Sequence, residues 1–106
     1  MARVIIRPKA RRDINAVLVY YIETAGLDVA RRFRKAATET FRELAEFPMM
    51  GAPRKIRTPE FQGVRMWRVR DFESFLIFYM PRADGIAVER VIHGSHDYRR
   101  VLESRA

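Results

Sequence analysis

Residues with acid–base or anion-binding side chains gather near the end of this 106-residue sequence, directly after an apolar run. The group comprises Arg90, His93, His96, Asp97 and Tyr98. Imidazole and phenol groups transfer protons, and the planar guanidinium of arginine binds phosphate or carboxylate through paired donors. With Arg68 and Arg70 added, the set is suited to metal-independent phosphate chemistry, in which arginines hold the phosphate while histidine or tyrosine moves a proton.

The two histidines also have a structural interpretation, which we favour. His93 follows a predicted strand, and we expect it to hydrogen-bond to nearby backbone or to Asp97, tying the C-terminal segment to the sheet. His93 and His96 lack a clear third ligand, and the sequence has no cysteine, so we expect no metal site. We expect no cofactor either.

Composition indicates one domain spanning residues 1–106, because 48% hydrophobic residues in a chain of this length support a single core. The absence of cysteine is compatible with a reducing compartment, and no apolar run approaches the ~20 residues that cross a bilayer. We therefore expect a cytoplasmic protein without membrane contact. Its net charge of +8, from 21 Lys and Arg against 13 Asp and Glu, attracts polyanions such as RNA, DNA or an acidic protein segment.

The first half of the chain predicts a strand and then two antiparallel helices. The β-type run from Arg3 to Arg7 ends at Pro8, which suits the first turn of a helix. Charged residues of that helix, including Asp13, are expected to point away from the core, and Gly26 should end it. Asp28 is expected to cap the second helix, which stops before a proline. The predicted buried faces are Ala10, Ile14, Val17, Leu18, Tyr21 and Ile22, then Phe33, Ala37, Thr40, Phe41, Leu44 and Phe47.

The second half predicts an irregular stretch over residues 48–63 and then a three-stranded antiparallel meander. Residues 64–71 alternate as a strand, which places Arg68 and Arg70 on one face. Residues 75–80 form a buried strand, and Asp84-Gly85 indicates a hairpin turn before the last one.

These elements predict an α+β fold in which the helical hairpin packs on an antiparallel sheet that ends in the meander. A closing turn or short helix is expected over residues 97–104. The pattern does not determine where the first strand joins the sheet.

Several residues outside the C-terminal group have two interpretations. Arg68 and Arg70 fit a solvated strand face or a partner-binding surface. We interpret Trp67 as core or interface packing, because a single tryptophan without exposed aromatic neighbours is a poor platform for nucleobases. Met49 and Met50 could cap the helical hairpin or form an adaptable apolar patch for a partner.

The whole chain resembles the ParE branch of the RelE/ParE toxins of bacterial toxin-antitoxin modules. The residues that carry this resemblance are the basic first strand, Ala10 to Asp13 (ARRD), Tyr21-Ile22, the proline loop before Pro53-Arg54, Phe78-Tyr79, and Arg90-Val91-Ile92-His93-Gly94 with Asp97. The resemblance implies a small α+β toxin that is neutralised by an acidic ParD-like antitoxin in a hetero-oligomeric complex.

The resemblance implies two possible activities. ParE-type toxins inhibit DNA gyrase and block replication, and we expect this activity, with Arg68, Arg70, Arg90, Tyr98, Met49 and Met50 as target- or antitoxin-binding residues. RelE-type toxins cut mRNA on the ribosome, and the corresponding catalytic set would be Arg68, Arg70, Arg90, His93 and Tyr98. The lysine-rich cluster of the RelE branch has no evident counterpart here, because lysine occurs only at Lys9, Lys35 and Lys55. A third possibility is an inactive toxin that retains only antitoxin binding.

Overall fold

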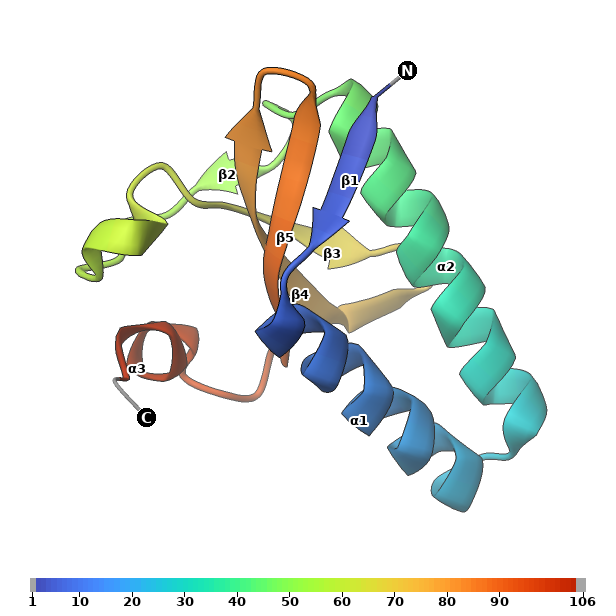
Figure 1. Ribbon diagram of the computed structural model, residues 1–106. Coiled ribbons are helices and arrows are strands. Elements are labelled where there is room, and N and C mark those ends of the chain that lie inside the picture. Colours follow the sequence, from blue (N-terminus) through green and yellow to red (C-terminus); the bar gives the residue numbers. More distant parts are fainter. Residues whose placement is uncertain (1, 105–106) are drawn as a thin grey trace.

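The protein has two long helices on one face of a five-stranded sheet (Figure 1). The computed structural model describes residues 2–104. The elements are β1 (Arg3–Ile6), α1 (Pro8–Thr24), α2 (Leu27–Glu46), β2 (Ala52–Pro53), the 3-10 helix η1 (Pro59–Phe61), β3 (Arg65–Val69), β4 (Phe72–Arg82), β5 (Gly85–His93) and α3 (Tyr98–Glu103). The predicted α+β class, helical hairpin, C-terminal meander and closing helix are confirmed. The stretch predicted to be irregular also contains β2 and η1. Within residues 2–104, no helix is long and apolar enough to cross a bilayer.

The helical hairpin packs through most of the predicted apolar positions, with two errors at its ends. Ile22 and Phe47 are 49% and 61% exposed, respectively, because each lies near the end of its helix. Gly26 has a φ of 99°, a left-handed conformation that favours glycine, and it serves both as the stop after α1 and as the N-cap of α2. Asp28 therefore falls inside the first turn of α2 and does not cap it, contrary to prediction.

The strand order is β1-β5-β4-β3-β2, and the position of the first strand is now defined. β1 runs parallel to β5, with Arg3 opposite Gly85, whereas the other neighbours are antiparallel. A Cβ atom on Gly85 would lie 1.9 Å from the carbonyl oxygen of Arg3, so only glycine allows β1 to approach this closely.

The predicted turn at Asp84-Gly85 is shifted by one residue. Arg82 pairs with Gly85, so the two-residue loop is Ala83-Asp84, and Gly85 already belongs to β5. Asp71 has a φ of +66°, a left-handed conformation that aspartate tolerates better than most residues, in the tight connection between β3 and β4.

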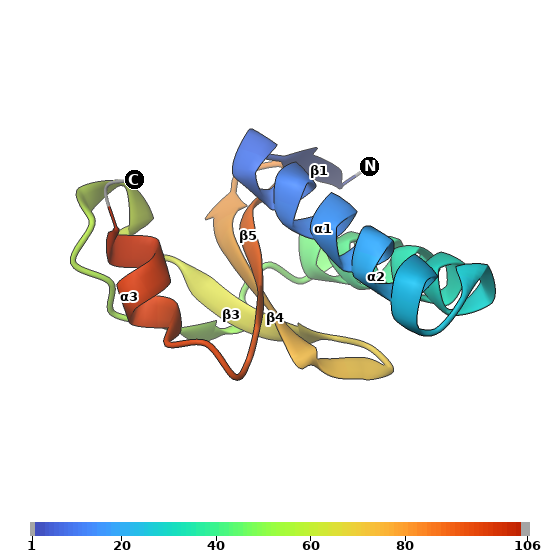
Figure 2. The ribbon, with the colours of Figure 1, turned by 90° about the horizontal axis from the view of Figure 1, so that it is seen from below.

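Both faces of the sheet are covered (Figure 2). On one face, Phe33 and Leu44 of α2 pack with Ile77 and Tyr79 of β4 in the main core. On the other face, α3 and residues 54–63 cover a smaller cluster around Leu76 and Phe78. Figure 2 shows α3 on the opposite side of β4 and β5 from α1 and α2.

Candidate binding groove and the predicted site residues

An open groove of about 550 Å³ lies between the C-terminal half of α2 and the β2–β3 edge of the sheet. It is lined by Thr40, Glu43, Met50, Ala52, Met66, Trp67, Arg68, Val69, Arg70, Asp71 and Glu73. Three predicted binding residues, Met50, Arg68 and Arg70, thus meet at one site. They come from a loop, a strand and a turn.

The edge of β3 is open along this groove. β2 pairs only with Arg65 and Met66, so within residues 2–104 no strand pairs with β3 on this side from Trp67 to Val69. The N–H of Arg70 is bonded instead to the Thr40 hydroxyl, at 3.2 Å. An open strand edge offers backbone donors and acceptors to an extended segment of a second polypeptide.

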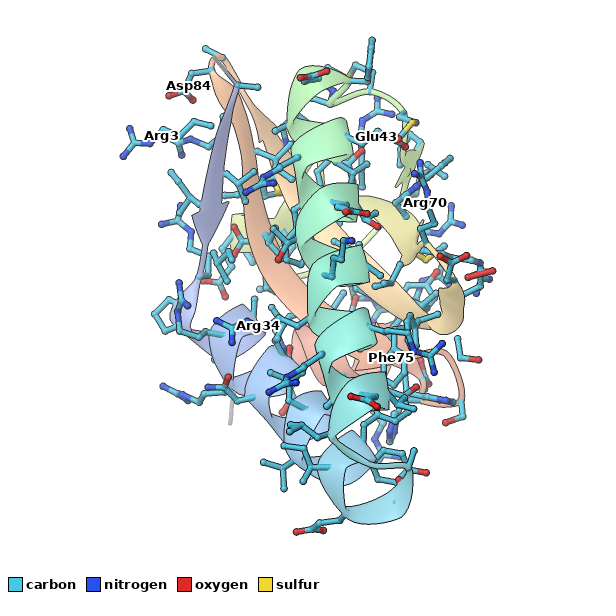
Figure 3. All side chains as sticks on the ribbon, turned by 90° about the vertical axis from the view of Figure 1, so that its right-hand side faces the viewer. Arg3, Arg34, Glu43, Arg70, Phe75 and Asp84 are labelled. Carbon is cyan, nitrogen blue, oxygen red and sulfur yellow. The ribbon has the colours of Figure 1, made fainter. Side chains whose placement is uncertain are left out.

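The two groove arginines are held by different partners. Arg68 donates to the carbonyl oxygen of Glu73 at 2.7 Å, and Arg70 forms an ion pair of 2.6 Å with Glu43 (Figure 3). β3 ends at Val69, so Arg70 is a turn residue; the prediction that both arginines lie on one strand is wrong, although both line the groove. Three carboxylate residues, Glu43, Asp71 and Glu73, also line the groove and outnumber the two arginines, so the groove itself has no excess of positive charge.

Tyr79 fixes the methionine segment, residues 48–51, to the sheet. Its hydroxyl donates to the carbonyl oxygen of Pro48 at 2.7 Å and accepts from the N–H of Gly51 at 2.8 Å. Burial raises the pKa of the Tyr79 hydroxyl, so it remains protonated and can donate at neutral pH. A Cβ on Gly51 would come within 2.5 Å of this oxygen, so glycine is required there.

Large exposed apolar side chains occur in the groove and in the segment that leads to it. Met49 is 67% exposed and Phe47 is 61% exposed, while Trp67, in the groove wall, is 36% exposed. Met50 is half-buried and packs against the main core, so Met50 behaves as a cap and Met49 as a patch residue. Sequence reasoning missed Phe47 as a surface residue, although its position directly before Pro48 indicated a helix end.

Arg90 is part of a structural clasp between α1 and β5. Its guanidinium binds both carboxylate oxygens of Asp13, at 2.7 and 3.1 Å, and the N–H of Val91 donates to the same carboxylate at 3.0 Å. The prediction that Asp13 points away from the core is therefore wrong. β1 pairs with β5 only as far as Val88, and the Asp13 carboxylate takes the place of a strand partner beyond that point.

The remaining C-terminal residues have separate roles. The Nδ1 atom of His93 lies 2.7 Å from the Ser95 hydroxyl and accepts the Ser95 N–H at 3.0 Å, which confirms the expected bond to nearby backbone. Asp97 instead caps α3 by accepting the N–H of Arg100. The ring of Tyr98 packs on Phe78, with 5.0 Å between centroids.

The structure does not assemble the five residues predicted for the nuclease alternative into one site. Arg68 and Arg70 line the groove, whereas Arg90 and His93 line a different pocket beside α1, together with His96. Tyr98 packs in the cluster under α3.

Fold and groove together define a small, basic α+β domain with a surface that suits a second polypeptide. The family model for the ParE toxin of type II toxin-antitoxin system, parDE, matches residues 4–98, so the chain belongs to this toxin family. A solved structure of the chromosomal ParDE toxin-antitoxin system from P. aeruginosa has the same fold, with a TM-score of 0.69 and 22% identity. That alignment covers 88% of this chain and 96% of the other. No curated protein sequence matches significantly.

Proposed function

We propose that this ParE-family toxin inhibits DNA gyrase as a protein ligand and is neutralised by an acidic, ParD-like antitoxin that occupies the groove. The observation that carries the antitoxin site is the open edge of β3 beside apolar groove walls. A partner strand there would gain main-chain hydrogen bonds, and its side chains would contact Met50 and Trp67. The net charge of +8 would speed the approach of an acidic partner.

Arg68, Arg70, Met49 and Met50 are the proposed contacts at this site. Arg70 is bound to Glu43 in this structure, and a partner carboxylate could replace Glu43 without leaving a buried charge, because the Glu43 side chain is itself 36% exposed. Tyr98, with the Arg99 guanidinium 5.7 Å from its ring centroid, is the proposed target contact on the opposite face of the sheet. A contact role for Arg90 stays a prediction, since its side chain is held by Asp13.

The alternative function is ribosome-dependent cleavage of mRNA. It is favoured by the pocket of about 300 Å³ in which Arg90, His93 and His96 meet. The candidate catalytic residues are engaged inside the fold, which favours the gyrase proposal: Arg90 is bound to Asp13, His93 is hydrogen-bonded to Ser95, and the Tyr98 ring packs on Phe78.

The test is to induce the toxin and to measure translation, mRNA integrity and gyrase-dependent supercoiling in parallel. We expect supercoiling to fall first while transcripts stay intact. Prompt arrest of translation with cleaved mRNA would refute the gyrase proposal, and harmless expression would indicate an inactive toxin.

The antitoxin site is tested by co-expressing the antitoxin encoded beside the toxin. Trp67→Ala should remain toxic but escape neutralisation. The matched control is Ile22→Ala, which removes an exposed apolar side chain from the distant end of the hairpin. Equal neutralisation of both variants would refute the groove as the antitoxin site.

A further inference from the structure

The outer side of α1 carries a stripe of four residues that point away from the rest of the fold. Arg12, Ala16, Val19 and Glu23 recur at spacings of four, three and four residues, which places them on one side of the helix. All four are exposed, Val19 by 53%. Figures 1 and 2 show α1 at the outside of the molecule, with the sheet and α2 on its inner side. We call these four residues the outer α1 stripe.

The apolar part of this stripe is not needed to pack α1 on the sheet. The opposite side of the helix already supplies the residues that lie in or against the main core, namely Ala10, Ile14, Val17, Leu18 and Tyr21. A helix on the surface of a domain normally has one apolar side and one polar side. Ala16 and Val19, with Tyr20 beside them at 57% exposure, therefore form a second apolar surface on α1. An exposed apolar surface with charged ends indicates a contact with another protein.

Two opposite charges lie at the ends of the stripe, and neither has a partner in the fold. Within residues 2–104, Arg12 and Glu23 form no ion pair, although Arg12 lines a pocket with Glu60. Neither has an opposite charge three or four residues away along α1. The first turn of α1 has no acidic residue and the last turn, which contains Glu23, has no basic one, so the helix dipole does not favour this distribution of charge.

We propose that the outer α1 stripe is the contact between two copies of this toxin, with their α1 helices antiparallel. The pairs 12 and 23, and 16 and 19, have the same midpoint in the sequence. A two-fold axis at that midpoint places Ala16 opposite Val19 of the second copy and Arg12 opposite Glu23 of the second copy. Unlike charges then meet at both ends of the contact. The small side chain of Ala16 lets the two helices approach to about 8–10 Å.

Charge identifies a second copy as the occupant of the stripe. The antitoxin is expected to be acidic, whereas the stripe carries one cation and one anion and so offers no net attraction to an acidic segment. Two chains of net charge +8 repel each other over most of their surfaces, and a neutral stripe whose charges complement those of its own copy reduces this repulsion. The stripe spans about 16 Å of helix, so the contact is small and the dimer should be reversible.

The test measures the dimer dissociation constant of the purified full-length toxin by sedimentation equilibrium. Arg12→Glu and Glu23→Arg should each weaken the dimer by at least about tenfold, because each turns two attractive charge contacts into two repulsive ones. The double variant Arg12→Glu/Glu23→Arg should return to within about threefold of the wild type, because it restores both contacts. The single variants change the net charge in opposite directions and the double variant leaves it at +8, so net charge alone cannot produce this pattern.

The matched control is Lys35→Glu, which changes the net charge as Arg12→Glu does but lies at an exposed position of α2. It should retain the wild-type dissociation constant, as should Trp67→Ala in the groove, since the dimer contact is separate from the antitoxin site. Circular dichroism verifies that the variants are folded; the two charge changes on α1 are ones that the helix dipole favours.

Three results would overturn the dimer contact. The first is a wild-type toxin that stays monomeric at about 1 mM. The second is a double variant that dimerises no better than the single variants. The third is a loss of antitoxin binding in the single variants without any dimer of the wild type, which would assign the outer α1 stripe to the antitoxin.

Discussion

Replacement of Asp13 by alanine should destabilise this toxin more than any other loss of a single helix carboxylate. The substitution removes three hydrogen bonds: two from the Arg90 guanidinium, at 2.7 and 3.1 Å, and one from the Val91 N–H, at 3.0 Å. Breaking a buried ion pair costs about 3–5 kcal/mol, because the remaining charge loses its partner. The side chains of Asp13 and Arg90 are 18% and 20% exposed, so water can partly solvate the Arg90 guanidinium once Asp13 is removed. We therefore expect a loss of about 2–4 kcal/mol in the free energy of unfolding.

The assay is urea unfolding at neutral pH, and the same loss should lower the melting temperature by about 10–20 °C. Asp28→Ala is the matched control, since Asp28 lies in the first turn of α2 and forms no ion pair within residues 2–104; it should cost less than about 1 kcal/mol. A double-mutant cycle with Arg90→Met isolates the pair. A coupling energy near zero, or an Asp13→Ala loss no larger than that of the control, would refute the clasp.

Two further predictions concern Tyr79 and Glu89. Tyr79→Phe should cost about 1–3 kcal/mol in urea unfolding, because it leaves the Pro48 carbonyl and the buried Gly51 N–H without their partner. The same variant should bind the antitoxin more weakly in calorimetry. Unchanged affinity would show that the methionine segment is fixed by other contacts. Burial raises the pKa of the Glu89 carboxyl above its usual 4.5, although Arg7 opposes the shift, so the charged form destabilises the fold. Glu89→Gln should therefore stabilise the protein above the folded-state pKa, and the gain should disappear as the pH falls towards 4.5; a gain that persists at low pH would contradict this.

Much of the fold was predictable from local pattern. The spacing of apolar residues indicated both helices, and the unbroken apolar run of residues 75–80 indicated the central strand. The position of β1 was not predictable, because its pairing with β5 depends on the contact of Arg3 with Gly85, and local periodicity contains no information about such distant contacts. The Asp84-Gly85 turn was misassigned for the same reason: the glycine is required by β1 rather than by the turn.

The binding groove was predictable only in part. Its arginines and methionines stood out as residue types, but their meeting at one site depends on how β2 ends beside α2. Asp13 was missed because its neighbours in the helix sequence are charged, which indicates a solvated face, whereas its partner Arg90 comes from the far end of the chain. Only the long-range contact with Arg90 distinguishes an Asp13 that is bonded to the sheet from one that faces solvent.

The pairing of β1 with β5 makes the fold dependent on the synthesis of β5. During synthesis Arg3 to Ile6 leave the ribosome about 80 residues before their strand partner, residues 85–88. A chain truncated before Gly85 would lack the strand that joins β1 to β4, and with it the Asp13 clasp on Arg90. Contacts between such distant segments close slowly. A chain that stops before β5 therefore cannot complete the sheet, so the folded domain forms only after residues 85–88 have been made.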